Sequence, residues 1–446
     1  MKRRISTVIC TVCLFLSVTL ALASCNGGAA GGIADAEINE NGELILIYDD
    51  GREQNLGVVV GEEGKDGADG SDGQNGTNGS ITITANGSSI PAASAKGLRS
   101  AVSIVCKFQA TVQQGGWWPG YGGTTTKSYS SAGSGVIYRL DKSEGDAFII
   151  TNYHVVYDRS SNSKNGISED ISVYLYGSEL ENMAIPATYV GGSLYYDIAV
   201  LRIEDSEVLK ASEARAIDVA DSDKVVVGDS AIAIGNAQGL GISATSGVVS
   251  VDSEYITMTA SDGKTEVSFR VMRVDTAVNS GNSGGGLYDD EGNLIGIVNA
   301  KIVYDGVENI GYAIPSNVAV SITENIIDYC FGTDVERVQK AVLGVTVSAA
   351  DSKAVFDPTT GLIRIEETVY IHEIAKGSLT DGVLLPEDVL VSATLNGKTI
   401  RLTRQYQVID MMLDVRAGDT VTLNILRGGE EKTVSITVTE DCLTEY

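Results

Sequence analysis

The sequence predicts a mainly β protein with two folded domains after an N-terminal extension. From about residue 97, short apolar runs rich in β-branched residues alternate with Gly, Asp and Ser turns, which is typical of an all-β barrel or sandwich. Helical patterning is clear only at 318–330 and again near 406–413. With 446 residues, the chain is long enough for roughly two or three domains of about 150 residues each.

The N-terminal segment has the pattern of a targeting signal. A basic start at 2–4 precedes an apolar run over 5–23. The residues "LASC" that end at Cys25 resemble the lipobox of bacterial lipoproteins, in which the cysteine is acylated. We therefore expect residues 1–24 to be a lipoprotein signal peptide and Cys25 to carry the lipid that anchors the chain to a membrane. A plain secretory signal or an uncleaved signal anchor is the alternative, and both also place the chain outside the cytoplasm.

Residues 25–96 read as a hairpin followed by a stalk. The stretch 42–60 contains two strands flanking Asp50-Gly51, a strong hairpin signal. Glycine then recurs at every third position from 61 to 79, giving a collagen-like GxY tract without proline. Because a stable triple helix needs many proline-rich triplets, we favour an extended hydrophilic stalk over a trimerising collagen helix.

Charge and cysteine content exclude several function classes. The net charge of −27 argues against a nucleic-acid or anionic-membrane surface, because phosphate groups are bound by clustered Lys and Arg. Beyond the expected signal peptide and lipid anchor, only Cys106, Cys330 and Cys442 remain, so at most one disulfide can form. No CxxC or HExxH pattern is present, and we expect neither a metal nor a cofactor.

Three polar residues have the types needed for nucleophilic catalysis. A serine hydroxyl needs a base to accept its proton, and the base needs an acid that fixes its tautomer. His154 follows the apolar strand "AFII", Asp197 precedes "IAVLRI", and Ser283 lies in "GNSGGGL". Each residue alone is more often structural, as a packed histidine, a strand-capping aspartate or a turn serine. The other histidine, His372, is expected to be a strand residue only.

Together, "TNYHVV", "YDIAVLRI" and "GNSGGGL" resemble the chymotrypsin-fold serine proteases, specifically the HtrA/DegP family of envelope proteases. The segments "GNAQGLGISATSGVVS", "DTAVNSGNSGG" and "GYAIPSNVA" match the same family in the correct order. The resemblance implies a chymotrypsin-like double β-barrel over 97–332, with Ser283 as nucleophile, His154 as general base and then acid, and Asp197 orienting the histidine.

The glycines around the serine are expected to shape an oxyanion hole. They permit a tight loop that directs the amides of Gly281 and Ser283, with Asn282 between them, at one point. Ser280 and Gly286 stand where the family usually has proline, which puts the rigidity of this loop in doubt.

The resemblance also implies walls for the substrate pocket and a variable loop. The pocket residues are expected to be Thr276, Ala277, Val278, Asn299, Ala300 and Lys301. No acidic residue is among them, so we expect a preference for small or medium apolar side chains rather than Lys or Arg, although Lys301 weakens this expectation. Trp117 and Trp118, in the variable loop, suit contact with a partner subunit or unfolded substrate, or else fold back on their own barrel.

Residues 335–446 resemble the C-terminal PDZ domain of the same family. Leu343, Gly344 and Val345 match the loop whose backbone amides bind a peptide carboxylate. The expected protein is thus a lipid-anchored envelope serine endopeptidase acting on misfolded or regulatory proteins, with peptide C-termini as partners of the PDZ domain and a homotrimer as its assembly. One alternative is a catalytically silent PDZ scaffold. Another is a structural stalk or adhesin, but a stalk or adhesin would leave the three catalytic residue types unexplained.

Overall fold

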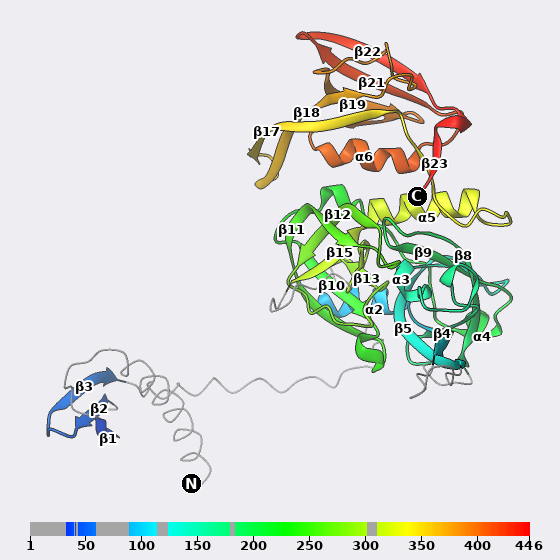
Figure 1. Cartoon of the computed structure of the whole chain (residues 1–446). Helices are drawn as coiled ribbons and strands as arrows, with labels where there is room; N and C mark the ends of the chain where they lie inside the picture. Colours follow the sequence, from blue (N-terminus) through cyan, green and yellow to red (C-terminus); the bar gives the residue numbers. More distant parts are fainter. Residues whose placement is uncertain are drawn as a thin grey trace, which may run out of the picture. The chain divides into compact units, whose positions relative to one another are not determined.

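The computed structural model describes residues 33–39, 41, 43–58, 89–113, 124–178, 183–300 and 310–446. The chain forms two compact units, Met1–Thr82 and Ile83–Tyr446 (Figure 1). Several features expected from the sequence lie outside the described residues: the signal peptide, Cys25, the GxY tract, Trp117, Trp118 and Lys301.

The N-terminal unit contains a three-stranded antiparallel sheet. Its strands are β1 (Ile33–Ile38), β2 (Glu43–Tyr48) and β3 (Glu53–Val58), with β2 in the centre. Strands β2 and β3 pair across the turn at Asp50 and Gly51, as the sequence predicts, and Gly51 has φ 79. Strand β1, which sequence patterning missed, pairs with the other edge of β2.

The second unit begins with a closed antiparallel barrel in the order β4-β5-β6-β9-β8-β7, closed by pairing of β4 with β7. Its strands are β4 (Ala101–Gln113), β5 (Thr124–Asp141), β6 (Asp146–Thr151), β7 (Asp170–Leu175), β8 (Ile185–Ser193) and β9 (Ile198–Ile203). Branched apolar side chains such as Ile104, Ile149 and Leu201 fill the interior. Gly133 on β5 leaves room for Val155, whose side chain a Cβ would overlap.

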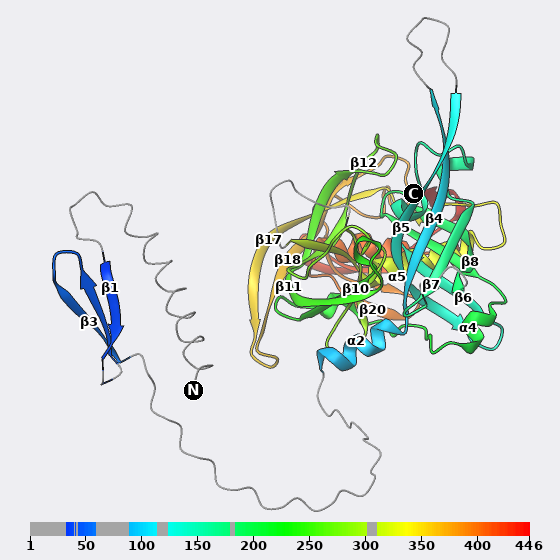
Figure 2. The same cartoon turned by 90° about the horizontal axis from the view of Figure 1, so that it is seen from below.

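A second closed barrel follows, in the order β10-β11-β12-β15-β14-β13. Three of its strands, β10, β11 and β12, are labelled in Figure 2. Its strands are β10 (Ser230–Gly235), β11 (Ser243–Thr259), β12 (Glu266–Val274), β13 (Gly286–Tyr288), β14 (Leu294–Val298) and β15 (Gly311–Pro315). The double-barrel architecture expected from the sequence is confirmed. Aliphatic and aromatic side chains from both barrels, including Ile198, Ile234 and Tyr288, share one continuous core.

Helices occupy the ends and edges of the barrels. Helix α2 (Ile90–Leu98) begins at Ser89, whose Oγ accepts from Ala92 N at 3.4 Å, and it packs on β10 and β13. The expected domain division at residue 97 falls within this helix. Helix α5 (Ser316–Tyr329) matches the helix expected over 318–330. The shorter helices are α3 (Tyr153–Val156), α4 (Glu207–Ala211), η2 (Lys164–Gly166), η4 (Ser222–Lys224), η5 (Ala237–Gly239) and η6 (Glu440–Cys442).

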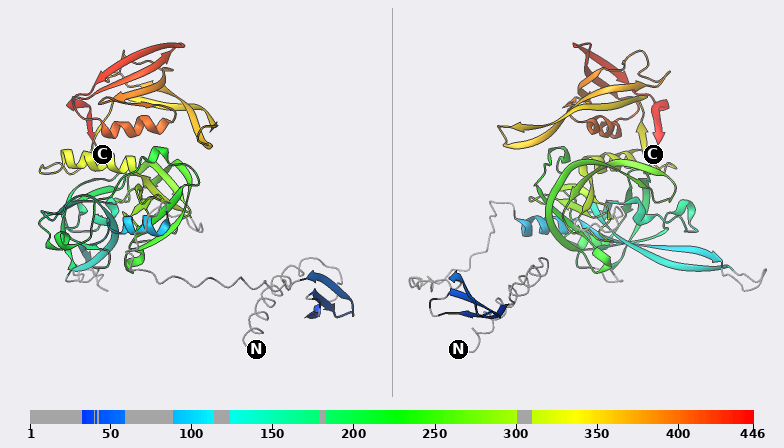
Figure 3. Two further views of the ribbon diagram at one scale, coloured as in Figure 1. Left: turned by 180° about the vertical axis from the view of Figure 1, so that it is seen from behind. Right: turned by 60° about the vertical axis from the view of Figure 1, so that its left-hand side comes forward.

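Beyond α5, the chain forms a sheet with one helix, and we call this region the C-terminal domain. The sheet runs β17-β18-β19-β21-β22, with β20 paired to β19, and β16 pairs with β23 separately. Its elements are β16 (Gln339–Ala341), β17 (Val345–Asp357), β18 (Leu362–Ile374), β19 (Val389–Leu395), β20 (Lys398–Arg401), α6 (Gln405–Asp414), β21 (Thr420–Arg427), β22 (Glu430–Thr437) and β23 (Leu443–Glu445). Helix α6 lies between this sheet and helix α5 (Figure 3).

A buried arginine joins α6 to the second barrel. Arg270 of β12 is 3% exposed, and its two terminal nitrogens each lie 3.0 Å from Asp223 Oδ1. From α6, Asp410 Oδ2 lies 3.2 Å from Arg270 Nε, and the Tyr406 ring centroid lies 3.9 Å from Arg270 Cζ.

The described helices include none that is both long and apolar enough to cross a bilayer.

Candidate active site

His154 and Asp197 are in direct hydrogen-bonding contact in the first barrel. Asp197 Oδ2 lies 2.6 Å from His154 Nδ1, and Asp197 Oδ1 accepts from the His154 backbone N at 2.9 Å. Because an ionised carboxylate only accepts, Nδ1 carries the proton, which leaves Nε2 of a neutral imidazole as a base. The pair can therefore accept a proton from a third group at Nε2.

The backbone on both sides of this pair is held by further hydrogen bonds. Asp197 has φ 55, an uncommon conformation for a residue with a side chain. Its carbonyl accepts from Asn152 Nδ2 at 2.9 Å and from Tyr153 N at 3.1 Å. These bonds tie the start of β9 to the start of α3, so strand and helix present the acid and the base to each other.

A second donor reaches Asp197 from the other barrel. Asn299 Nδ2 donates to Asp197 Oδ2 at 2.9 Å, and Asn299 is fully buried. Asn299 follows β14, so the carboxylate receives hydrogen bonds from both barrels. A carboxylate that accepts from this many donors is fixed in orientation.

The loop that carries Ser283 is held through its carbonyl groups. Each backbone carbonyl from residue 279 to residue 283 accepts one hydrogen bond, 2.7–3.0 Å long. The donors, in the order of the five carbonyls, are Asn282 N, Gln238 N, Ser134 Oγ, Gly285 N and Ser134 N. Ser134 thus bonds the loop twice, through Oγ to Gly281 O at 2.7 Å and through N to Ser283 O at 2.8 Å. This network holds the loop despite the absence of proline at 280 and 286.

Two amides of the same loop remain available to a ligand. Among the residues that the structure describes, the backbone N–H groups of Gly281 and Ser283 have no acceptor, whereas Asn282 N donates to Asn279 O at 3.0 Å. Gly281 has φ 96, and a Cβ there would overlap Asn236 O. This conformation suits glycine only, and the two free donors can stabilise negative charge on an oxygen.

Close approach of the two barrels brings the serine loop to the histidine segment. A Cβ on Gly284 would overlap Ser134 O and Thr151 Oγ1 and would lie 2.9 Å from Asn152 N, two residues before His154. Gly286 is equally restricted, because the ring of Tyr288 occupies the position of its missing side chain. Gly284 is thus required by the close approach of the two barrels, and Gly286 by packing within the second barrel.

Comparison with known proteins gives the family of this site. Residues 133–297 match the family model described as a trypsin-like peptidase domain. The chain is 34% identical over 314 residues to the serine protease Do-like HtrA of Bacillus subtilis (strain 168), covering 69% of this chain and 63% of that relative. The double-barrel region has a trypsin-like fold and is similar to serine proteases of the HtrA group.

Other relatives belong to the same group of proteins. The periplasmic serine endoprotease DegP of Escherichia coli (strain K12) is 32% identical over 331 residues, covering 74% of this chain and 61% of DegP. The chain spans about six tenths of the length of these two curated relatives. A solved structure, the HtrA-type protease AlgW with decapeptide, aligns with a TM-score of 0.49 at 24% identity, covering 80% of this chain and 99% of that one.

Two of the residues expected to line the substrate pocket form side-chain hydrogen bonds within the barrels instead. Thr276 is buried and donates through Oγ1 to Ala231 O at 2.8 Å, and Asn299 donates to Asp197. Ala277 and Val278 follow β12, with Val278 packed against the core of the second barrel. Ala300 lies at the edge of the described residues, next to Lys301.

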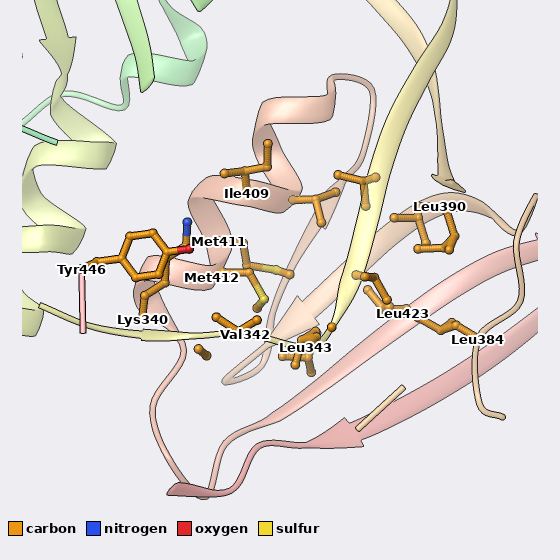
Figure 4. A pocket seen from close by; sticks show the side chains of 17 residues that line it. Lys340, Val342, Leu343, Leu384, Leu390, Ile409, Met411, Met412, Leu423 and Tyr446 are labelled. Atoms are coloured by element: carbon orange, nitrogen blue, oxygen red, sulfur yellow. The ribbon is translucent and has the colours of Figure 1, made fainter. Parts of the chain in front are cut away.

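The loop Leu343–Val345 borders a cavity of about 180 Å³ in the C-terminal domain (Figure 4). Helix α6 supplies the opposite wall with Val408, Ile409, Met411 and Met412. Within the described part of the chain, the amides of Leu343 and Gly344 have no acceptor. Gly344 has φ 77, and a Cβ there would overlap Ser378. We call this cavity the C-terminal groove; it combines an apolar lining with two free donors.

Sequence reasoning missed two residues that organise the active site. Ser134 occurs in "GSGV" within an expected strand, and Asn299 was assigned to the pocket wall. Their partners are 147 and 102 residues away, at Gly281 and Asp197. The signal available in the sequence was weak: a polar residue inside or directly after an otherwise apolar strand.

In the described residues, no cluster of three or more His, Cys, Asp or Glu side chains is arranged to hold a metal ion.

Proposed function

We propose that this chain is a serine endopeptidase that uses Ser283, His154 and Asp197 to hydrolyse peptide bonds. The observation that carries the proposal is the 2.6 Å contact between Asp197 Oδ2 and His154 Nδ1, next to a serine loop with two free amides. The relationship to serine proteases of the HtrA group supports the same reaction.

In the proposed mechanism, Ser283 Oγ attacks the carbonyl carbon of the substrate peptide while His154 Nε2 takes the hydroxyl proton. Asp197 stabilises the imidazolium through Nδ1–H, and the amides of Gly281 and Ser283 donate to the oxyanion. The C–N bond then breaks as His154 returns the proton to the leaving amine. Water, deprotonated by His154, hydrolyses the acyl-enzyme and releases the carboxylic acid product and Ser283.

The proposed substrates are misfolded or regulatory polypeptides of the cell envelope, with small or medium apolar side chains before the cleaved bond. This preference rests on the absence of acidic residues from Thr276–Val278 and from Asn299 and Ala300. Acylation of Cys25 would anchor the chain to the membrane, facing outside the cytoplasm. The C-terminal domain, as a PDZ domain, would bind peptide C-termini, and the proposed assembly is a homotrimer.

The test compares wild type with Ser283→Ala on unfolded casein and with a serine-directed fluorophosphonate. We expect wild type to cleave casein and to be labelled, and Ser283→Ala to do neither. Alanine fits the loop because the loop is held by its carbonyl groups. Ser280→Ala is the matched control: this exposed serine belongs to the same loop and should remain active.

Two results would overturn the proposal. Cleavage of casein by Ser283→Ala at the wild-type rate would exclude Ser283 as the nucleophile. Absence of cleavage and of labelling in wild type would favour a catalytically silent scaffold instead.

A further inference from the structure

The three-stranded N-terminal sheet has two faces of different character (Figure 1). Side chains alternate between the faces along each strand, and paired residues of neighbouring strands share a face. Ile38 of β1 pairs with Leu44 of β2, and Ala36 pairs with Leu46. We call this side the apolar face; by pairing and alternation it carries Ala36, Ile38, Leu44, Leu46, Tyr48 and Gln54.

The opposite side of the sheet carries its charges. The three strands contain four carboxylates and no lysine or arginine. Asp35 of β1 and Glu53 of β3 both pair with Ile47 of β2, and alternation puts the other two carboxylates on the same side. We call this side the acidic face; its carboxylates are Asp35, Glu37, Glu43 and Glu53. The strands therefore contribute no charge to the apolar face.

The apolar face is uncovered among the residues that the structure describes. None of the described residues of this unit is buried, and Ile38 is 39% exposed. At one end of the face, Tyr48 OH donates to Gln54 Oε1 at 2.7 Å, and Arg52, which pairs with Asp50, lies over the Tyr48 ring. A small sheet is stable in water only when its apolar face is covered. The apolar face therefore requires a partner.

The sequence that follows the sheet indicates which partner. Glycine recurs at every third position from 61 to 79, beginning three residues after β3 ends at Val58. This period is required where three chains wind about a common axis, because only glycine fits there, whereas a simple spacer needs no fixed period. Without proline the tract alone favours an extended stalk, so its chains need a folded unit that brings them together. Further copies of the same sheet would be that unit.

Charge also favours further copies of the chain over a lipid surface. Anionic headgroups attract basic segments, and the strands of this sheet carry only carboxylates. When copies pack through their apolar faces, the strands bury uncharged side chains and the acidic faces point outward into water. No carboxylate of the strands then has to be buried.

We propose that the apolar face packs against the same face of two further copies of this chain, which makes the N-terminal sheet a self-association module at the start of the GxY tract. The inference rests on the homotrimer of the proposed function and names a contact surface for it, and it does not depend on the peptidase reaction. Leu44 and Leu46 of the central strand lie in the middle of the contact. Packing three sheets together sets the three chains in register where the glycine repeat begins.

The association test uses the full mature chain with two changes. Cys25→Ser prevents a lipid from holding copies together, and Ser283→Ala prevents self-cleavage. We expect trimers by sedimentation velocity, and Leu46→Lys should raise the concentration needed for association about tenfold or more, because a charge would have to be buried. Ile45→Lys is the matched control, since it lies one residue away on the acidic face, opposite Glu37, and should associate like the parent protein. Equal association of the two lysine variants would overturn the proposal.

A cross-linking test reports on the face itself without a destabilising charge. In the same background, Cys442→Ser leaves only Cys106 and Cys330, which are buried, as native cysteines of the barrels and the C-terminal domain. Ala36→Cys then places a thiol on the apolar face, and Glu37→Cys places one on the acidic face. With a short bismaleimide, Ala36→Cys should give covalent dimers, the largest product that one reactive cysteine per chain allows, in several-fold higher yield than Glu37→Cys. Equal yields, or no dimers from Ala36→Cys, would overturn the proposal.

The lipid surface is tested with the same proteins and phosphatidylglycerol vesicles. We expect no binding of the parent protein to these vesicles. Binding that Leu46→Lys abolishes, together with absence of cross-linking between copies, would overturn the proposal in favour of a lipid surface. All three measurements use protein without the Ser283 hydroxyl, so they decide the inference separately from the proposed peptidase reaction.

Discussion

The side chain of Asn299 donates a hydrogen bond of 2.9 Å to Asp197 Oδ2, from the second barrel to the first. The same oxygen lies 2.6 Å from His154 Nδ1. The carboxylate that orients the histidine is thus itself oriented by a residue of the other barrel, and the docking of the barrels is part of the catalytic geometry.

The first prediction concerns this contact. Asn299→Leu removes a donor to a buried carboxylate, and we expect kcat to fall about tenfold to a hundredfold, in line with the value of a hydrogen bond to a charged group. Asn299→Asp should be worse, because a second carboxylate would repel Asp197. Steady-state hydrolysis of a short peptide checks both variants. Unchanged kcat in Asn299→Leu would show that Asp197 needs no donor from the second barrel.

Gly281→Ala tests the oxyanion site. The residue has φ 96, and a Cβ would overlap Asn236 O, so alanine must displace the loop. Loss of one oxyanion donor costs about a hundredfold or more in kcat. We expect that loss with little change in the affinity for a peptide inhibitor that lacks a tetrahedral centre. Wild-type kcat would contradict the assignment of Gly281 N as a donor to the oxyanion.

Ser134→Ala tests the bond that holds the serine loop to the first barrel. Its Oγ donates to Gly281 O at 2.7 Å and accepts from Asn236 N at 2.8 Å. Removing a buried hydroxyl with two partners should lower stability by about 1–3 kcal/mol and lower kcat more than it raises KM. Thermal unfolding and peptide hydrolysis measure the two effects. Ser130→Ala, on the same strand in a less buried segment, is the control and should change neither quantity.

Asp410→Asn tests the electrostatics of the domain contact. Burial raises the pKa of Asp410 to about 6, from 3.8 for an unperturbed carboxyl. Between about pH 4 and 6, the native state retains a proton that the unfolded chain has lost, so this group lowers the free energy of unfolding as pH rises through that window. The effect is lost in the asparagine variant, which is neutral at every pH.

We therefore expect the free energy of unfolding of Asp410→Asn, taken relative to that of wild type, to increase from pH 4 to pH 7. The increase should be up to about 3 kcal/mol. The melting temperatures of both proteins at the two pH values give the comparison, and Asp334→Asn, at an exposed position, is the control. A constant difference between Asp410→Asn and wild type over this range would show that Asp410 does not titrate there.

Much of the architecture was readable from local patterns. Apolar runs bounded by turn residues predicted the high content of β-strands. The periodic segment at 318–330 predicted α5 to within two residues at its start. The hairpin at Asp50-Gly51 followed from turn chemistry alone. Strand β1 was missed because its alternation is short and contains small and acidic residues, which have weak strand propensity.

By itself, the sequence determined that the chain is rich in short β-strands separated by turns. It also determined the candidate residues His154, Asp197 and Ser283 and the glycines around the serine. These features depend on residue type and on spacing over a few positions. Only the tertiary structure decided that Asn299 contacts Asp197, that Ser134 holds Gly281, and that Lys340 contacts Tyr196. These pairs are separated by 102, 147 and 144 residues. Each pair forms when closed barrels and the C-terminal domain dock, so its geometry depends on the packing of whole elements and leaves no local pattern in the chain.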